Sequence, residues 1–134
     1  ALVSLTDWLA TFADIAGFNL SKDAGEDSVS ILPLPKGSNQ PVRESVIHHS
    51  ASGKFAIRQG DWLFIDYKTG DGNSGQRKEP DWFRKERGVV SYPSNTMLFN
   101  LKDDPQQKRN LYKNHPEKAG ELKKLLDDSR SAPQ

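Results

Sequence analysis

Apolar residues recur at helical spacing near the beginning of the chain. In "SLTDWLATFADIAGF" they stand at positions 5, 8, 9, 12, 13 and 16, which is the period of an amphipathic helix. Ser4 and Asp7 have the spacing of a capping box, and Gly17 stands where a left-handed residue often ends a helix. The pattern predicts a helix over residues 5–16.

A second helical pattern lies near the other end, in "NHPEKAGELKKLLDDSR". Asn114 or His115 is positioned as the cap, and Pro116 is tolerated in the first turn because an N–H there has no helical partner. One face of the segment is apolar, formed by Ala119, Leu122, Leu125 and Leu126. Residues 114–130 are therefore predicted to be helical.

Between these helices, four short segments have strand patterns. Three of them, about 45–50, 54–58 and 62–67, are joined by short glycine-containing connections that suit hairpins. The fourth, 96–101, runs into "DDP", which stops a strand because proline lacks an N–H and aspartate favours turns. The segment 62–67 is apolar on both faces, so both faces of the sheet should be covered. The C-terminal helix can cover one, and helix 5–16 or a missing domain the other.

Two segments show neither pattern. Residues 19–44 contain several prolines and glycines, and we expect an ordered but irregular connector there. Residues 68–95 form a segment of nearly 30 residues, and loops of that length are often functional or disordered.

Length, composition and charge exclude several classes of protein. With 134 residues, 34% of them hydrophobic, one small domain with a thin core is expected, so part of its burial should come from elsewhere, as in a fragment. A net charge of +1 favours neither nucleic acid nor an anionic membrane. No apolar run has the length of a membrane span, and "ALVSLTDWLA" lacks a signal-peptide pattern. The absence of cysteine excludes disulfides and a thiol nucleophile.

Four motifs together resemble one family. They are "LTDWLATFADIAG", "FAIRQGDWLFI", "LFNLKDDPQQKRNL" and "HPEKAGELKKLL", and their order and spacing resemble the C-terminal region of sulfatases of the arylsulfatase and N-acetylgalactosamine-6-sulfatase type. The resemblance covers the chain apart from residues 68–95. It implies an α+β fold, in which a small antiparallel four-stranded sheet packs with a C-terminal helix and follows an amphipathic helix. The chain departs from the family at Ala10, Leu63 and Gln106-Gln107, where proline, lysine and Gly-Glu are usual.

The resemblance also implies a domain organisation. Residues 1–35 would be the terminal helix and connector of the catalytic domain, and residues 36–134 the C-terminal subdomain with 68–95 as an insertion loop. The missing N-terminal catalytic domain would be the partner and a sulfated saccharide the substrate. By the same resemblance, the protein would be periplasmic or secreted.

Catalysis in such enzymes depends on two groups that we expect outside this chain. One is a formylglycine, made from Cys or Ser in a C/S-x-P-S-R-like motif, and the other is a calcium ion held by Asp and Asn. The nearest match here, "SYPSN" at 91–95, lacks the arginine and precedes a strand, so we interpret it as a chance match. The sequence therefore predicts no catalytic residue, metal site or cofactor in this chain, with calcium and formylglycine in the missing domain.

The candidate substrate contacts are His48, His49, Trp82 and Arg84. The two histidines are adjacent on a strand and point to opposite faces, so they cannot share one metal ion, but either could donate to a sugar sulfate. Trp82 and Arg84 lie in the long segment and could stack on a sugar ring, form an interdomain contact or belong to an unpacked loop tip. The simpler alternative for each histidine is a surface or packing role.

Other charged residues have simpler explanations. Asp103 and Asp104 are accounted for by turn chemistry, since calcium would need several more oxygen ligands. Lys54 and Arg58 share a strand face, which we interpret as a solvated edge in preference to a sulfate site.

Three functions remain open at this point. The first is the C-terminal part of a sulfatase that hydrolyses sulfate esters of glycans, which completes the fold, shapes specificity and is inactive alone. The second is a free-standing carbohydrate- or protein-binding module. The third is part of a phosphate-ester hydrolase of the same superfamily. The coding sequence upstream of Ala1 would discriminate among them.

Overall fold

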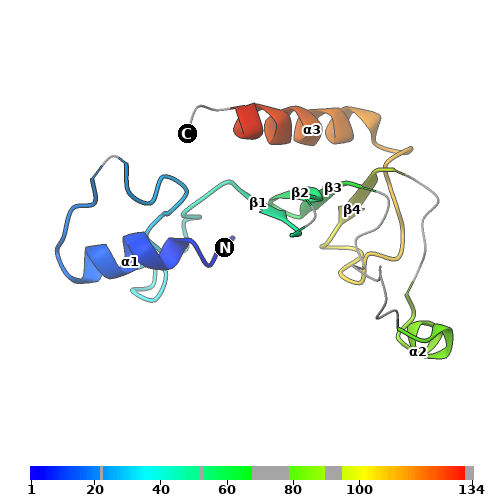
Figure 1. The fold of residues 1–134 in the computed structure, drawn as a ribbon, viewed down its shortest axis with the longest axis horizontal. Helices are drawn as coiled ribbons and strands as arrows, with labels where there is room; N and C mark the ends of the chain where they lie inside the picture. The colour runs from blue at the N-terminus through cyan, green and yellow to red at the C-terminus, as the bar shows by residue number, and fades with distance from the viewer. Residues whose placement is uncertain (22, 52, 68–78, 90–94, 132–134) are drawn as a thin grey trace. The chain divides into compact units, whose positions relative to one another are not determined.

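The computed structural model describes residues 1–21, 23–51, 53–67, 79–89 and 95–131 of the chain. It divides into two compact units, Ala1–Val46 and Ile47–Gln134, which we call the N-terminal unit and the sheet unit (Figure 1). Each is described by itself. The boundary expected between residues 35 and 36 refers to a catalytic domain outside this chain and stays a prediction.

The helix of the N-terminal unit is α1 (Asp7–Ile15). It ends as the sequence predicts, because Gly17 has a φ of 67°, the left-handed conformation that closes a helix. It begins two residues later than predicted. The Asp7 carboxylate accepts the Ser4 N–H at 2.7 Å, and the Asp7 N–H donates to the Ser4 carbonyl at 3.1 Å, so residues 4–7 fold into a turn ahead of the helix.

The connector that follows α1 is irregular but fixed to the helix by polar contacts, as expected. Thr11 Oγ1 accepts the Ile31 N–H at 3.0 Å, so one side chain of the helix satisfies a connector amide. Gly25 has a φ of 72°, and a Cβ added there would lie 3.0 Å from the nearest leucine methyl carbon of α1. Only glycine combines that φ with so close an approach.

The sheet unit contains a four-stranded antiparallel sheet in the order β1-β2-β3-β4. The strands are β1 (Ser45–His49), β2 (Phe55–Gln59), β3 (Trp62–Asp66) and β4 (Met97–Asn100). Ile57 pairs with Phe64, and Phe64 pairs with Leu98. The four predicted strands are confirmed to within one or two residues at each end.

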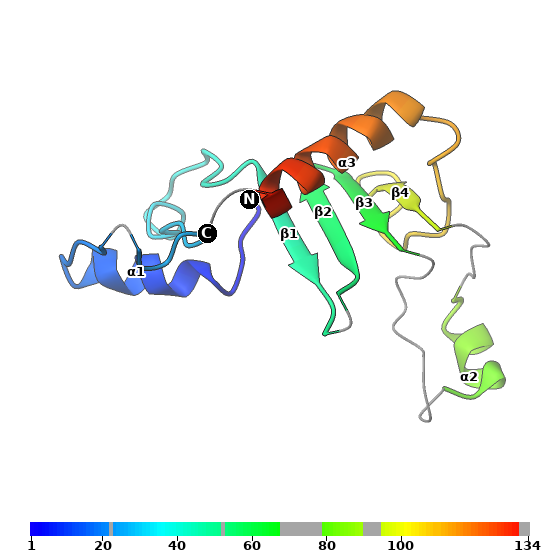
Figure 2. The same cartoon turned by 45° about the horizontal axis from the view of Figure 1, so that its top comes forward.

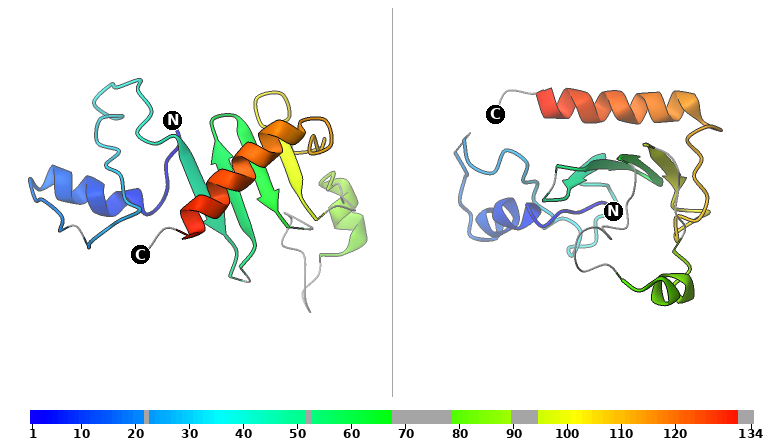
Figure 3. Two further views of the ribbon diagram at one scale, coloured as in Figure 1. Left: turned by 90° about the horizontal axis from the view of Figure 1, so that it is seen from above. Right: turned by 45° about the vertical axis from the view of Figure 1, so that its right-hand side comes forward.

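A long helix, α3 (Pro116–Ser131), lies across one face of this sheet (Figures 2 and 3). The buried apolar cluster between them consists of Ile57, Phe64, Leu98, Ala119, Leu122 and Leu126. The opposite face carries a second buried cluster, made of Ala56, Leu63, Ile65, Met97 and Phe99. Both faces of the sheet are thus buried, as the doubly apolar third strand predicts, and α3 covers the first.

The acidic stretch after β4 forms a turn that closes the edge of the sheet. Asp104 accepts the backbone N–H groups of Lys108 at 3.0 Å and Arg109 at 2.8 Å. Asn110 Oδ1 then accepts the Leu98 N–H at 3.0 Å, so a side-chain amide takes the place of a fifth strand. These hydrogen bonds explain why the strand stops so abruptly in the sequence.

The structure differs from the sequence expectation in the long segment 68–95. Residues 79–89 of it are described, and they contain a short helix, α2 (Asp81–Glu86), where no element was predicted. The local signals are present, since Pro80 stands at the N-cap and basic residues occupy the last turn. The polar, Gly-rich composition of the whole segment favours a loop, and for that reason the sequence pattern predicts no helix there.

Candidate functional site

The two histidines of β1 occupy opposite faces of the sheet. The His49 ring centroid lies 5.3 Å from that of Phe55, and the Arg130 guanidinium lies 4.2 Å from the centre of the same Phe55 ring. Phe55 packs against the cluster beneath α3, so His49 is on the α3 face. Since side chains alternate along a strand, His48 is on the other face, together with Ala56.

Three further side chains share the face of His48. Arg58 of β2 and Lys54, which directly precedes β2, are each two residues from Ala56 and so lie on its face, and Lys54 Nζ lies 4.4 Å from the centre of the Tyr67 ring. We call His48, Lys54, Arg58 and Tyr67 the His48 cluster. The sequence pattern had already placed Lys54 and Arg58 on one face, but it had not joined them to His48 or Tyr67, because strand pairing decides that.

The electrostatics of the two faces differ. Among the described strand residues the one carboxylate is Asp66, which pairs with Phe55 and so lies on the α3 face. There Lys123 Nζ approaches it to 3.7 Å. The face of the His48 cluster therefore presents cationic and neutral donors without a strand carboxylate, which suits contact with an anion.

The other two candidates lie on α2. Trp82 is 67% exposed and its ring is 5.6 Å from that of Phe83 in an edge-on arrangement, while Arg84 is half-buried. In Figures 1 and 2, α2 lies on the β4 side of the sheet and β1 forms the opposite edge. The helix that carries Trp82 and Arg84 is therefore at the other side of the sheet from the strand that carries the two histidines.

The described residues contain no group of three or more histidine, aspartate or glutamate side chains suited to hold a metal ion. Asp104 is committed to its turn, and the hydrogen bond from the Lys108 N–H is the main reason that the pKa of its carboxyl is lowered from 3.8. The segment "SYPSN" lies outside the described residues apart from Asn95. No helix among the described residues has the length and apolar character needed to cross a membrane.

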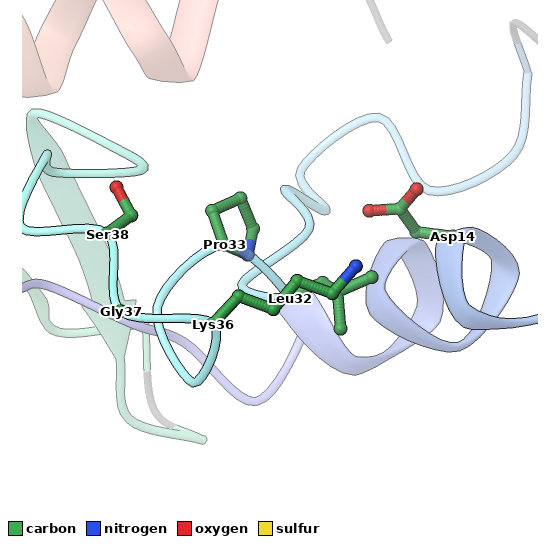
Figure 4. A pocket seen from close by; sticks show the side chains of 6 residues that line it. All are labelled: Asp14, Leu32, Pro33, Lys36, Gly37 and Ser38. Atoms are coloured by element: carbon green, nitrogen blue, oxygen red, sulfur yellow. The ribbon is translucent and has the colours of Figure 1, made fainter.

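A surface pocket lies in the N-terminal unit (Figure 4). Its lining residues are Asp14, Leu32, Pro33, Lys36, Gly37 and Ser38. The Asp14 carboxylate accepts the Ser30 hydroxyl at 2.7 Å, so its polar capacity is partly used within the unit. The charged side chains of its lining are those of Asp14 and Lys36, and none of the lining residues is a histidine.

This α+β arrangement, with the four motifs in their places on it, is similar to that of the C-terminal region of sulfatases, as two comparisons with known proteins indicate. A curated relative, the N-acetylgalactosamine-6-O-sulfatase of Bacteroides thetaiotaomicron, is 30% identical over 131 residues, which are 98% of this chain and 24% of the relative. The chain thus spans about a quarter of the length of this relative. The resemblance found in the sequence is confirmed, although no family model matches the chain.

Solved structures agree with this assignment. A Bacteroides thetaiotaomicron protein described with the metabolism of multiple glycosaminoglycans superposes with a TM-score of 0.69 at 26% identity, covering 93% of this chain and 24% of that one. A 2-O glycosaminoglycan sulfatase superposes with a TM-score of 0.61 at 20% identity, covering 92% of this chain and 23% of that one. The second likeness shows the fold alone.

Proposed function

We propose that this chain is the C-terminal part of a sulfatase that hydrolyses sulfate esters of glycans, and that it completes the fold and shapes specificity but is inactive alone. The observation that carries the proposal is the match to an N-acetylgalactosamine-6-O-sulfatase. The match spans 98% of this chain and 24% of that relative. The solved relative described with glycosaminoglycan metabolism supports the substrate class. From the same family resemblance, we propose a periplasmic or secreted location.

The hydrolytic chemistry belongs, in this proposal, to the part of the protein outside this chain. A formylglycine nucleophile and a calcium ion would be held there, as the resemblance to sulfatases implies. This chain's own contribution is then to bind and orient the saccharide beyond the reacting sulfate. Such contacts determine which substrates react when the bond-breaking chemistry is shared.

Within this chain we propose His48 as the main saccharide contact, in preference to His49. Both histidines are exposed, but His48 lies on the face that also presents Lys54 and Arg58, whereas the His49 ring lies against that of Phe55 on the α3 face. Neutral and cationic donors suit the sulfate groups of a glycan. Trp82, with its exposed ring, and Arg84 are proposed as a separate contact on α2.

The experiment compares two substrates with the full-length enzyme. Replacing His48 by Ala removes a contact that exists only when the glycan is bound. We expect kcat/KM on the sulfated saccharide to fall about 5- to 150-fold, the equivalent of about 1 to 3 kcal/mol, with less than about a twofold change on a small aryl sulfate. Trp82→Ala should behave in the same direction through a lost stacking contact.

His49→Ala is the matched control, since it alters the neighbouring residue on the other face. It should affect stability through the Phe55 contact and leave the ratio of the two activities unchanged. Equal losses on both substrates after His48→Ala would remove the specificity role. A wild-type enzyme that cleaves phosphate esters and no sulfate ester would replace the sulfatase by the related phosphate-ester hydrolase.

A further inference from the structure

The short helix α2 is closed at its C-terminal end by backbone hydrogen bonds. It has six residues, and isolated helices this short are not stable in water. Gly88 has a φ of 67°, and its N–H donates to the Lys85 carbonyl at 3.0 Å. The Val89 N–H donates to the Arg84 carbonyl, also at 3.0 Å. This pair of bonds satisfies the last carbonyl groups of the helix and fixes how it ends.

Arg87, directly after α2, joins the aromatic side chains of the helix to the residue that precedes it. The Arg87 guanidinium donates to the Glu79 carboxylate at 2.7 Å and lies 5.3 Å from the centre of the Phe83 ring. The Phe83 ring in turn lies 5.6 Å from the Trp82 ring, edge-on at 67°. One cation therefore holds the two ends of α2 together and supports Trp82 through Phe83.

The C-terminal end of α2 lies beside the turn that follows β4. A Cβ added at Gly88 would lie 3.6 Å from Lys108 Nζ, and the Lys108 N–H donates to the Asp104 carboxylate that closes this turn. Figure 2 shows α2 on the β4 side of the sheet. Because the strand order is β1-β2-β3-β4, three strand spacings, about 14 Å, separate the strand of His48 from β4. A single sugar ring does not span that distance.

The exposed surface of α2 has the size and chemistry of a sugar contact. Trp82 is 67% and Phe83 38% exposed, so two aromatic rings are accessible beside charged side chains. A pyranose ring has an apolar face of C–H groups and a rim of hydroxyl groups, which match an aromatic ring with polar neighbours. A protein partner typically buries about 800 Å² on each side, far more than this six-residue helix supplies.

We propose that α2 is a platform for a second sugar unit of the glycan, in which Trp82 stacks on the sugar ring and Arg87 is a positioning residue. The inference rests on the proposed function and deepens it. Because His48 and α2 are too far apart to contact one ring, the parent sulfatase acts on oligosaccharides in preference to monosaccharides. The platform lies away from the reacting sulfate, so it binds substrate and transition state equally and lowers KM.

The test compares two chain lengths with the full-length enzyme. The probes are 6-O-sulfated N-acetylgalactosamine, chosen after the curated relative, and a glycosaminoglycan tetrasaccharide that carries the same single sulfated unit. We expect kcat/KM to be about 2- to 10-fold higher on the tetrasaccharide. Trp82→Ala and Arg87→Ala should each lower this ratio toward one through a higher KM on the tetrasaccharide. Arg87→Lys should retain a larger part of the ratio, because an ammonium group can still pair with Glu79.

Lys85→Ala is the matched control, since it removes an exposed cation from the same helix, and it should keep the wild-type ratio. Equal kcat/KM values of the wild type on the two probes would overturn the platform, while activity on both would leave the proposed function intact. A wild-type ratio in Trp82→Ala would also overturn the platform. A wild-type ratio in Arg87→Ala would remove the positioning role, and Arg87→Lys still tests that role if the Ala variant does not fold.

A wild-type enzyme without activity on sulfate esters would remove the sulfatase, and calorimetry with the unsulfated tetrasaccharide would then test α2 separately. Binding that Trp82→Ala weakens would support the platform. No binding, or binding that this variant leaves unchanged, would overturn it.

Discussion

At the scale of single residues, Asp7 has the largest share in organising the N-terminal unit. It is fully buried, accepts the Ser4 and Val29 amides, and pairs with Arg43. Burial by itself would raise the pKa of this carboxyl, but the two backbone hydrogen bonds and Arg43 together lower the pKa below its usual 3.8. The folded state therefore favours the ionised form, which links the stability of this unit to pH.

We expect the N-terminal unit to lose stability in acid through Asp7. A lowered pKa means that the stabilisation is complete above 3.8, the usual value, and is lost as pH falls from there through the folded-state pKa. Hydrogen-exchange protection factors of the Val29 and Ile31 amides, measured between about pH 5 and pH 2, should fall across this window. Asp7→Asn should lower protection at neutral pH and remove its pH dependence.

Asp14 provides the matched control on the same helix. It is exposed and its carboxylate accepts one hydroxyl group, from Ser30. Asp14→Asn should keep the acid transition of the wild type. An unchanged pH profile in Asp7→Asn would show that another carboxyl causes the loss.

At the scale of elements, the Asn110 side chain makes hydrogen bonds to the edge of β4 that a neighbouring strand would otherwise make. Its Oδ1 accepts the Leu98 and Tyr112 amides, each at 3.0 Å, and its Nδ2 donates to the Thr96 carbonyl at 3.2 Å. One side chain thus satisfies backbone groups on both sides of the β4 edge. Unpaired edges favour association with other strands, so this closure also protects the sheet.

Asn110→Ala should destabilise the sheet unit by about 2 to 3 kcal/mol, because it leaves partly buried backbone groups without partners. Chemical denaturation followed by far-ultraviolet circular dichroism measures the change. Asn110→Asp retains the acceptor oxygens and should cost less than the Ala variant. An Asn110→Ala protein with wild-type stability would mean that water replaces the side chain at this edge.

At the scale of the whole molecule, the proposed function assigns to this chain a scaffold and contact surfaces, and assigns the hydrolytic chemistry to the rest of the parent protein. We expect the purified 134-residue chain to hydrolyse no aryl sulfate and to bind no calcium with a defined stoichiometry, because the nucleophile motif is absent from its sequence. Activity assays and isothermal titration calorimetry test the two halves of this prediction. Stoichiometric, tight calcium uptake would show that a ligand set forms here after all.

Much of the fold could be predicted because local patterns are strong. Helical spacing predicted α1 and α3, alternation predicted the four strands, and "DDP" predicted the end of β4. The short helix α2 was missed, since six residues give too short a pattern to stand out from a polar segment. The candidate site could be predicted as separate residues but not as a group, since the order of strands and the side of each face come from pairing between distant segments.

The sequence by itself determined which residues share a face, because periods of 3.6 and 2 are properties of the backbone. It also determined the likeness to sulfatases, which rests on four motifs in order. The tertiary structure decided what covers each face. It put His48 on the same face of the sheet as Lys54, Arg58 and Tyr67, placed the His49 ring against Phe55, and left the apolar side chains of α1 exposed with Asp7 buried. A local pattern records that one side of a helix is apolar, but only packing against another segment determines whether that side is buried within the unit or left for a partner.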